Sequence, residues 1–177
     1  FLNHKLIDDY INIICDCTDL IVATINNNKK ILICGNGGSA ADSQHFASEL
    51  IVRFKSERKS IPAIALTADS SVLTACANDY SFDKIFSRQI EGLGHPEDLL
   101  IGITTSGNSS NIIEAFNAAQ NLKMNSICLS GNDGGQTITN NINHTIIVPS
   151  SETARIQEIH KLIIHIWCEI IDSKIKY

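Results

Sequence analysis

The sequence has no long hydrophobic run. No segment approaches the roughly twenty uninterrupted apolar residues that a membrane-spanning helix needs, and the first residues do not have the basic, apolar and small-residue order of a secretory signal. We therefore expect a cytoplasmic protein. The 177 residues, 44% of them hydrophobic, are enough for one well-buried domain over residues 1–177.

The sequence also lacks an excess of basic charge and paired cysteines. Its formal net charge is -5 and its 14 Lys and Arg residues are dispersed, which excludes the charge pattern of a nucleic-acid binder. No C-x-x-C pair occurs, so neither a zinc knuckle nor a disulfide framework is expected. The cysteines, mostly in apolar segments, are predicted to be reduced core thiols: Cys15, Cys17, Cys34, Cys76, Cys128 and Cys168.

Short apolar segments alternate with segments of helical periodicity. Five of the apolar segments are typical of buried strands: residues 31–34, 63–66, 99–104, 126–129 and 145–148. Strands that are apolar on both faces and separated by helix-length segments form parallel sheets with right-handed crossovers. The sequence therefore predicts an α/β fold, a single doubly wound domain whose five-stranded parallel sheet is flanked by helices.

The two ends of the chain have helical periodicity, over about residues 1–27 and about residues 152–173. The C-terminal helix is apolar around most of its circumference and needs more than one neighbour. We expect both helices to pack between subunits. A thin polar stripe on the C-terminal helix is predicted to face solvent: Glu158, Lys161, His165, Glu169 and Asp172.

A glycine-rich segment, residues 35–39 (Gly-Asn-Gly-Gly-Ser), follows the first predicted strand and opens into a helix near Ala40. Glycines allow positive φ and close backbone approach, and a helix start offers unpaired N–H groups to an anion. The segment lacks the Lys-Ser/Thr end of a Walker loop. Glycine-rich turns also occur for purely geometric reasons, so this segment alone does not establish a phosphate site.

A second polar segment, residues 104–110 (Thr-Thr-Ser-Gly-Asn-Ser-Ser), follows the third predicted strand and precedes a helix. All of its residues except the glycine can donate side-chain hydrogen bonds, whereas N-capping requires one Ser or Thr. Clustered hydroxyls at a helix start can bind the oxygens of a phosphoryl group without a lysine. We therefore favour a phosphorylated metabolite as the ligand over capping alone.

Two candidate pairs of side chains lie on helices. His45 and Glu49 are four residues apart, so the imidazole and the carboxylate point the same way and could share a metal ion or a substrate, although most such pairs are surface pairs. Glu49 and Arg53 are also spaced as a helix ion pair. On the C-terminal helix, Gln157 and His165 are about two turns apart. No role is assigned to the remaining histidines: His4, His95, His144 and His160.

Four motifs occur in order along the chain: residues 35–39 with the following 41–46 (Ala-Asp-Ser-Gln-His-Phe), residues 78–79 (Asn-Asp), residues 105–109, and residues 154–158 (Ala-Arg-Ile-Gln-Glu) with His165 beyond them. Together they resemble the phosphoheptose isomerases of the sugar-isomerase (SIS) family, over nearly the whole chain. The chain departs from the family pattern at Ala154, where some relatives have an acidic residue, and at Thr104, where Ser is usual.

The resemblance implies an SIS fold, a homotetramer with active sites between subunits, and isomerisation of sedoheptulose 7-phosphate to D-glycero-D-manno-heptose 7-phosphate in bacterial heptose biosynthesis. It implies one zinc ion per active site, bound by His45, Glu49, Gln157 and His165, with Glu49 and His165 also catalytic. It further implies that the phosphosugar contacts a wider set of residues: Asn36, Gly37, Gly38, Ser39, Glu49, Arg53, Asn78, Asp79, Thr104, Thr105, Ser106, Ser109 and Gln157.

This chemistry needs a base and an acid. Moving a carbonyl between C1 and C2 requires removal of the neighbouring proton, passage through an enediol and reprotonation of the other carbon. Glu49 is the candidate base and His165 the candidate acid, while zinc would stabilise developing oxyanion charge. The sequence leaves open the division of roles between Glu49 and His165, and whether the heptose feeds lipopolysaccharide, capsule or another glycan.

Two other functions stay open. A non-catalytic member of the family binds the bacterial replication initiator protein, and residues 54–66 and 94–96 resemble that member too. It has lost the carboxylate and the imidazole equivalent to Glu49 and His165, which this chain keeps. A sugar-phosphate sensor would bind the ligand without converting it, but sensors of this family usually carry a DNA-binding module, for which 177 residues leave no room.

Overall fold

The computed structural model describes residues 4–139 and 141–175. The elements follow one another as α1 (His4–Asn26), β1 (Ile31–Gly35), α2 (Gly38–Ile51), β2 (Ala63–Ala65), α3 (Ser70–Asp79), the 3-10 helix η1 (Phe82–Lys84), α4 (Ser87–Leu93), β3 (Leu99–Ile103), α5 (Ser110–Asn121), β4 (Asn125–Gly131), the 3-10 helix η2 (Gly135–Thr139), β5 (His144–Val148) and α6 (Thr153–Lys174).

The five strands form one parallel sheet in the order β2-β1-β3-β4-β5. The register aligns Ile33 of β1 with Ile101 of β3, and Ile101 with Ile127 of β4. Each crossover between parallel neighbours requires a connection long enough to contain a helix. The predicted doubly wound α/β fold with a five-stranded parallel sheet is therefore confirmed.

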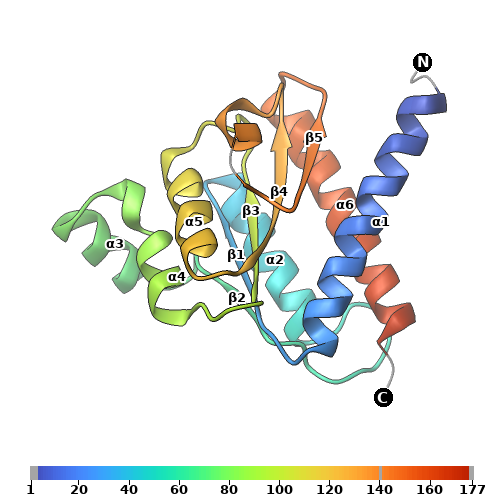
Figure 1. The fold of residues 1–177 in the computed structure, drawn as a ribbon, viewed down its shortest axis with the longest axis horizontal. Coiled ribbons are helices and arrows are strands. Elements are labelled where there is room, and N and C mark those ends of the chain that lie inside the picture. Colours follow the sequence, from blue (N-terminus) through green and yellow to red (C-terminus); the bar gives the residue numbers. More distant parts are fainter. Residues whose placement is uncertain (1–3, 140, 176–177) are drawn as a thin grey trace.

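Alternate residues of the central strands face opposite sides of the sheet, as the two-residue repeat of a strand dictates. Ile33, Ile101 and Ile127 face a core shared with α1, α2 and α6, where Phe46 of α2 packs against Trp167 of α6. Figure 1 shows α1 and α6 on this side of the sheet and α3, α4 and α5 on the other. The two helices nearest the predicted site, α2 and α6, therefore share one face.

The other face packs against α3, α4 and α5. Leu32, Leu100 and Cys128 are fully buried in this second core. Gly102 of β3 lies under the ring of Phe116, and a β-carbon at residue 102 would come within 2.5 Å of that ring. The missing side chain thus lets α5 approach the sheet closely.

The edge strands differ from the prediction that all five strands are buried on both faces. Every residue of β1 and β3 is buried, whereas β2 and β5 are partly exposed. Ile64 in the middle of β2 is 39% exposed. An edge strand has a neighbour on one side only, which explains the difference.

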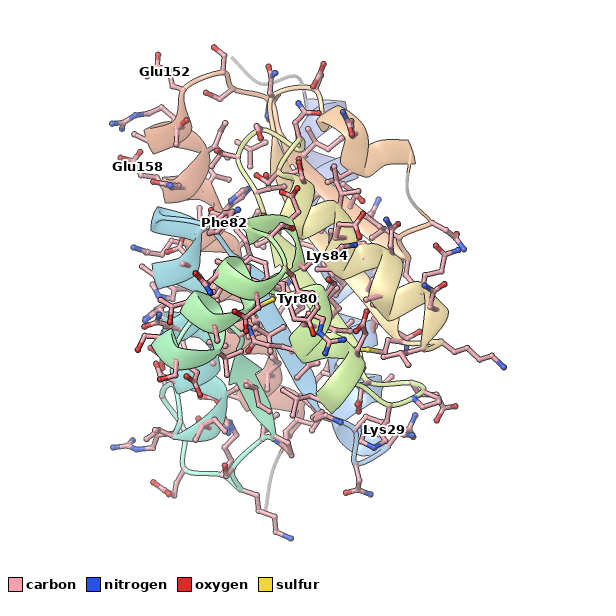
Figure 2. The ribbon with its side chains drawn as sticks, turned by 90° about the vertical axis from the view of Figure 1, so that its left-hand side faces the viewer. Lys29, Tyr80, Phe82, Lys84, Glu152 and Glu158 are labelled. Atoms are coloured by element: carbon pink, nitrogen blue, oxygen red, sulfur yellow. The ribbon has the colours of Figure 1, made fainter. Side chains whose placement is uncertain are left out.

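Several large apolar side chains remain exposed. Ile159 and Leu162 of α6 are 41% and 53% exposed, in agreement with the expectation that this helix is not fully covered by its own chain. Tyr80 and Phe82 are also exposed and lie on the side of the molecule formed by α3 and α4 (Figure 2). Among the helices within the described residues, none has the length and apolar character needed to cross a membrane.

Candidate active site

The predicted glycine-rich segment lies at the carboxyl end of β1. Gly37 has a φ of 54°, in the left-handed region that glycine adopts without strain. Helix α2 begins at the next residue, two residues earlier than expected from the sequence. The Ser39 N–H donates to the Asn36 carbonyl (2.9 Å) and the Ala40 N–H to the Gly37 carbonyl (3.1 Å). Gly37 has no side chain to cap the helix, so the start of α2 offers a ligand the Gly38 N–H and the positive end of the helix dipole. This geometry suits an anion.

The predicted hydroxyl-rich segment lies at the carboxyl end of the neighbouring strand, β3. The Thr104 hydroxyl oxygen accepts a hydrogen bond from the Gly107 N–H (3.2 Å), and the Ser106 hydroxyl oxygen accepts one from the Asn108 N–H (3.1 Å). Thr104 Oγ1 and Ser109 Oγ lie 3.3 Å apart. Since backbone N–H groups use these oxygens as acceptors, the hydroxyl hydrogens are available to donate to a phosphoryl group.

A pair of asparagines joins the two segments. Asn36 Nδ2 donates to Asn111 Oδ1 at 2.8 Å, and Asn111 Nδ2 donates to Asn36 Oδ1 at 2.9 Å. Asn111, in the first turn of α5, is buried. The pair holds the start of α2 against the start of α5, so that the two helix N-termini border one cavity.

That cavity has a volume of about 320 Å³, close to the lower end of the range for small-molecule sites. Its lining consists of Asn36, Gly37, Gly38, Ser39, Ile103, Thr104, Thr105, Ser109, Thr153 and Gln157. All of these except Ile103 and Thr153 were predicted to contact the phosphosugar. The structure therefore brings most of the predicted phosphate-binding residues together around one hollow.

A third segment, residues 131–137, supports the hydroxyl-rich one and was not predicted. The Thr137 N–H donates to the Gly107 carbonyl (3.1 Å), and the Gln136 N–H donates to Asn108 Oδ1 (3.0 Å). Gly107 has a φ of 68°, and a β-carbon there would collide with the backbone of Gly134. The adjacent glycines at residues 134 and 135 were the available sequence signal of this tight packing.

Helices α2 and α6 lie side by side and run in the same direction. Three pairs of residues mark successive turns of this contact: Gly38 with Gln157, Asp42 with Lys161, and His45 with His165. The first pair borders the cavity, and the third lies about two turns further along both helices. The contact between α2 and α6 therefore connects the cavity to the predicted catalytic side chains.

The predicted acid, base and metal ligands meet at the third pair. His45 Nε2 lies 2.9 Å from His165 Nε2 and 3.6 Å from Glu49 Oε1. The two imidazole rings meet edge to face, with centroids 5.2 Å apart, and Phe54 stacks on the other side of His165 at 5.6 Å. The side chains of His45 and Glu49 remain partly exposed. The cluster can thus reach a small molecule and exchange protons with it.

Three of the four predicted zinc ligands, His45, Glu49 and His165, are donor types that zinc accepts and lie close to one another. Tetrahedral zinc with bonds of about 2.0–2.1 Å separates two nitrogen ligands by about 3.3 Å, slightly more than the 2.9 Å between the two imidazoles. As they stand, no three His, Cys, Asp or Glu side chains in the described part of the chain have the arrangement of a metal site. Gln157 lines the cavity instead. Zinc would require the rings to spread slightly and the amide to turn toward them.

Another histidine, His160, is completely buried between α6 and the sheet. Its Nε2 lies 2.9 Å from the Ser130 carbonyl oxygen and donates to it. Burial lowers the pKa of His160, against the opposing effects of that hydrogen bond and of Asp42. Its Nδ1 has no hydrogen-bond partner among the described residues. The sequence assigned no role to His160, and its buried position between α6 and the sheet is that of a packed side chain.

Some predicted site residues lie outside the cavity lining. Asn78 and Asp79 are exposed at the end of α3, where the Asn78 amide donates to the Asp79 carboxylate (2.8 Å). Ser106 hydrogen-bonds within its own segment. Arg53 lies beyond the end of α2 and pairs with Glu57 (3.6 Å), so the expected helix ion pair with Glu49 is wrong.

The cysteines are free thiols. Five are buried, and burial raises the pKa of Cys17, Cys128 and Cys168 to about 12. Because a neutral thiol is a poor nucleophile, these side chains are inert at neutral pH. The prediction of core thiols is confirmed for the buried five, whereas Cys15 is exposed.

The sequence of this chain is similar to those of known proteins over most of its length. The SIS domain family matches residues 3–131. The phosphoheptose isomerase of Helicobacter pylori (strain P12) is 53% identical over 153 residues, which cover 86% of this chain and 79% of that protein. That of Campylobacter jejuni subsp. jejuni serotype O:6 is 54% identical over 155 residues, covering 88% and 83%.

Solved structures show the same similarity. A phosphoheptose isomerase from Francisella tularensis superposes with a TM-score of 0.89 at 43% identity, covering 92% of this chain and 86% of that one. The phosphoheptose isomerase from Neisseria gonorrhoeae superposes with a TM-score of 0.86 at 46% identity and the same coverage. The chain therefore belongs to the phosphoheptose isomerases of the SIS domain family and is a phosphosugar isomerase.

Proposed function

We propose that this isomerase converts sedoheptulose 7-phosphate to D-glycero-D-manno-heptose 7-phosphate through an enediol. The observation that carries the proposal is the α2–α6 contact, which joins the hydroxyl-lined cavity to the His45–Glu49–His165 cluster. His45 lies seven residues after Gly38, a distance of about 10 Å along the helix, comparable to the length of an open-chain heptose phosphate. The phosphate would lie in the cavity and the reacting carbons at the cluster.

The phosphate end is held by neutral donors. The Thr104 and Ser109 hydroxyls and the Gly38 N–H border the cavity, and the helix dipole favours the negative charge. Binding energy from this end, which does not react, positions C1 and C2 at the other end. A shorter phosphosugar would leave its carbonyl short of the cluster.

The reacting end needs one proton removed from carbon and another returned. Glu49 is the proposed base that takes the proton from the carbon next to the carbonyl. His165 is the proposed acid that moves a proton between the C1 and C2 oxygens. His45 contacts both groups and orients them, while the stacked Phe54 limits the rotation of the His165 ring.

We also propose that His45, Glu49, Gln157 and His165 bind one zinc ion. A bound zinc ion would supply Lewis-acid stabilisation of the negative charge that develops on the sugar oxygens. The donor types support this assignment, as does the closeness of His45, Glu49 and His165 to one another.

A tetramer with active sites between subunits would explain two features of the single chain. Ile159 and Leu162 expose apolar surface on α6, and Asn78 and Asp79 lie away from the cavity although the family resemblance assigns them to the substrate. We propose that subunit packing covers Ile159 and Leu162 and brings Asn78 and Asp79 to the active site of a neighbouring subunit. A monomeric mass at micromolar concentration would contradict this. The product would enter heptose biosynthesis in the cytoplasm.

The proposed reaction is tested by incubating the purified chain with sedoheptulose 7-phosphate and following the aldose product. Turnover is expected, with loss after treatment with a chelator and recovery when zinc is returned. Turnover that survives complete removal of metal contradicts the zinc assignment alone. A folded, zinc-loaded chain that binds the phosphosugar without converting it contradicts the enzymatic proposal and favours a sensor.

A further inference from the structure

A buried ion pair, Arg58–Asp172, lies outside the cluster that the reaction uses. Arg58 Nε lies 3.1 Å from Asp172 Oδ1, and both side chains are almost completely buried. The sequence placed Asp172 in the solvent-facing stripe of α6, but residues 52–60, between α2 and β2, cover it. Buried ion pairs contribute little net stability because the cost of desolvation offsets their attraction. Their remaining hydrogen bonds therefore indicate what such a pair does.

On one side, Arg58 closes the end of α2. Its Nη1 donates to the Leu50 carbonyl (2.8 Å), and its Nη2 donates to the Glu49 carbonyl (2.5 Å). Carbonyls in the last turn of a helix have no partner within the helix. A guanidinium at this position satisfies them and interacts favourably with the negative end of the helix dipole. The backbone of the proposed base, Glu49, is thereby fixed to Arg58.

On the other side, Asp172 fixes the segment that carries Phe54. Asp172 Oδ2 accepts hydrogen bonds from the Lys55 N–H (2.8 Å) and the Ser56 N–H (2.7 Å). Phe54, the residue before them, stacks on His165 with the ring planes 26° apart. His165 and Asp172 are seven residues apart, so they lie on the same face of α6, two turns apart. The segment thus runs along α6 from one to the other.

Through Arg58 and Asp172, these contacts connect the Glu49 backbone to the segment whose Phe54 ring stacks on His165. We propose that Arg58 and Asp172 are positioning residues that set the distance and orientation between the Glu49 carboxylate and the His165 imidazole. They touch neither substrate nor metal. The proposal rests on the roles of Glu49 and His165 proposed above. It adds the two residues that hold these groups at a fixed distance and orientation.

The test compares Asp172→Asn with Glu169→Gln. Glu169 is a matched control because it lies on the same helix and pairs with Lys55 of the same segment, but the pair is exposed. Asp172→Asn is expected to lower kcat about tenfold to a hundredfold, since small misplacements of reacting groups cost that much. KM should stay within about twofold because the phosphate cavity is untouched. Glu169→Gln should leave both constants unchanged.

A second readout does not depend on turnover. Because Phe54 stacks on His165, its ring is expected to shift the His165 signal in NMR spectra of protein labelled with ¹³C at the histidine rings. That signal is assigned as the one missing from the His165→Gln variant. Phe54→Leu should remove that shift, and Asp172→Asn should remove much of it, whereas Glu169→Gln should not. If the parent chain does not convert sedoheptulose 7-phosphate, the proposed function fails while this signal still tests the pair.

Two results would overturn the proposal. One is a folded Asp172→Asn variant with an unchanged kcat and an unchanged His165 signal. If Asp172→Asn does not fold, Arg58→Lys and Asp172→Glu keep both charges and should show the same two effects. The other is that all three variants are unfolded at temperatures where Glu169→Gln is folded, in which case the pair is only structural.

Discussion

Gln157 of α6 occupies the space that a side chain at residue 38 would need. A β-carbon on Gly38 would collide with the amide of Gln157, which lines the proposed phosphate cavity. The backbone of Gly38 is not in the left-handed region, so its conformation does not require glycine. The close approach of the two helices is what favours glycine at this position. This contact brings a proposed zinc ligand up to the start of α2, where we propose that the phosphate binds.

Gly38→Ala should impair function more than stability. The atoms that the new methyl group meets belong to the end of a flexible side chain, so Gln157 can turn away. Alanine is also the better helix former by about 1 kcal/mol, which offsets part of the cost of overpacking, so the free energy of unfolding should fall by no more than about 1 kcal/mol. The displaced amide should weaken zinc binding and lower kcat. Metal titration measures zinc binding, turnover measures kcat, and thermal unfolding measures stability.

The control for this substitution is Gly92→Ala in α4. Nothing lies within 4 Å of a β-carbon built there. Because alanine is the better helix former by about 1 kcal/mol, this variant should be as stable as the parent or more so, with full activity. A Gly38→Ala variant that behaves like Gly92→Ala would show that the position of Gln157 does not matter.

Glu49→Gln and His165→Gln should each abolish isomerisation while leaving the fold intact. Each substitution keeps a polar side chain of similar size but removes the group that exchanges protons, which is worth at least about a hundredfold in rate. Turnover and circular dichroism measure the two properties. The control is Glu158→Gln, which replaces an exposed carboxylate on α6, the helix of His165. This variant should be fully active. Unimpaired turnover in either site variant refutes the assigned roles.

The sheet and the positions of the glycine-rich and hydroxyl-rich segments could be predicted because each depends on local sequence. Buried central strands are apolar on both faces, and loops at the carboxyl ends of parallel strands meet at one edge of the sheet. The edge strands were less well predicted, because the sequence does not indicate which strands have a neighbour on one side only. The start of α2 was predicted two residues too late, because the glycines at 37 and 38 are poor helix formers and hide where the helix begins.

The proposed catalytic cluster could not be derived from spacing. His45 and His165 are 120 residues apart, and only the parallel packing of α2 on α6 brings them together. The resemblance to a family supplied this pairing. Asp172 was assigned to solvent because helical periodicity does not reveal that residues 52–60 fold over α6. Arg53 was placed on α2 because nothing in the sequence shows that Arg58 closes the helix at Ile51.

Thr104 should contribute to phosphate binding through its hydroxyl group. Thr104→Val keeps the shape but removes both the acceptor for the Gly107 N–H and the donor toward the cavity. Losing one such hydrogen bond costs about 1–1.5 kcal/mol, so KM should rise about tenfold with little change in kcat. Thr104→Ser, which keeps the hydroxyl, is the control and should bind normally. Competition by inorganic phosphate should weaken in parallel with KM in the valine variant.

The buried His160 should make the stability of the fold depend on pH. Burial lowers its pKa below the ordinary value of 6.5, so the unfolded chain takes up a proton at a higher pH than the folded chain does. The stabilisation due to neutral His160 is therefore complete above pH 6.5 and is lost as the pH falls through the lower folded pKa.

His160→Gln tests this pH dependence, since glutamine can still donate to the Ser130 carbonyl but does not titrate. The variant should lose less stability than the parent between pH 7 and pH 5 in urea unfolding, the window around and below the ordinary pKa of histidine. His144→Gln, at the start of β5, is the control and should keep the steeper dependence of the parent. Equal slopes for His160→Gln and the parent would mean that protonation of another group sets the response to acid.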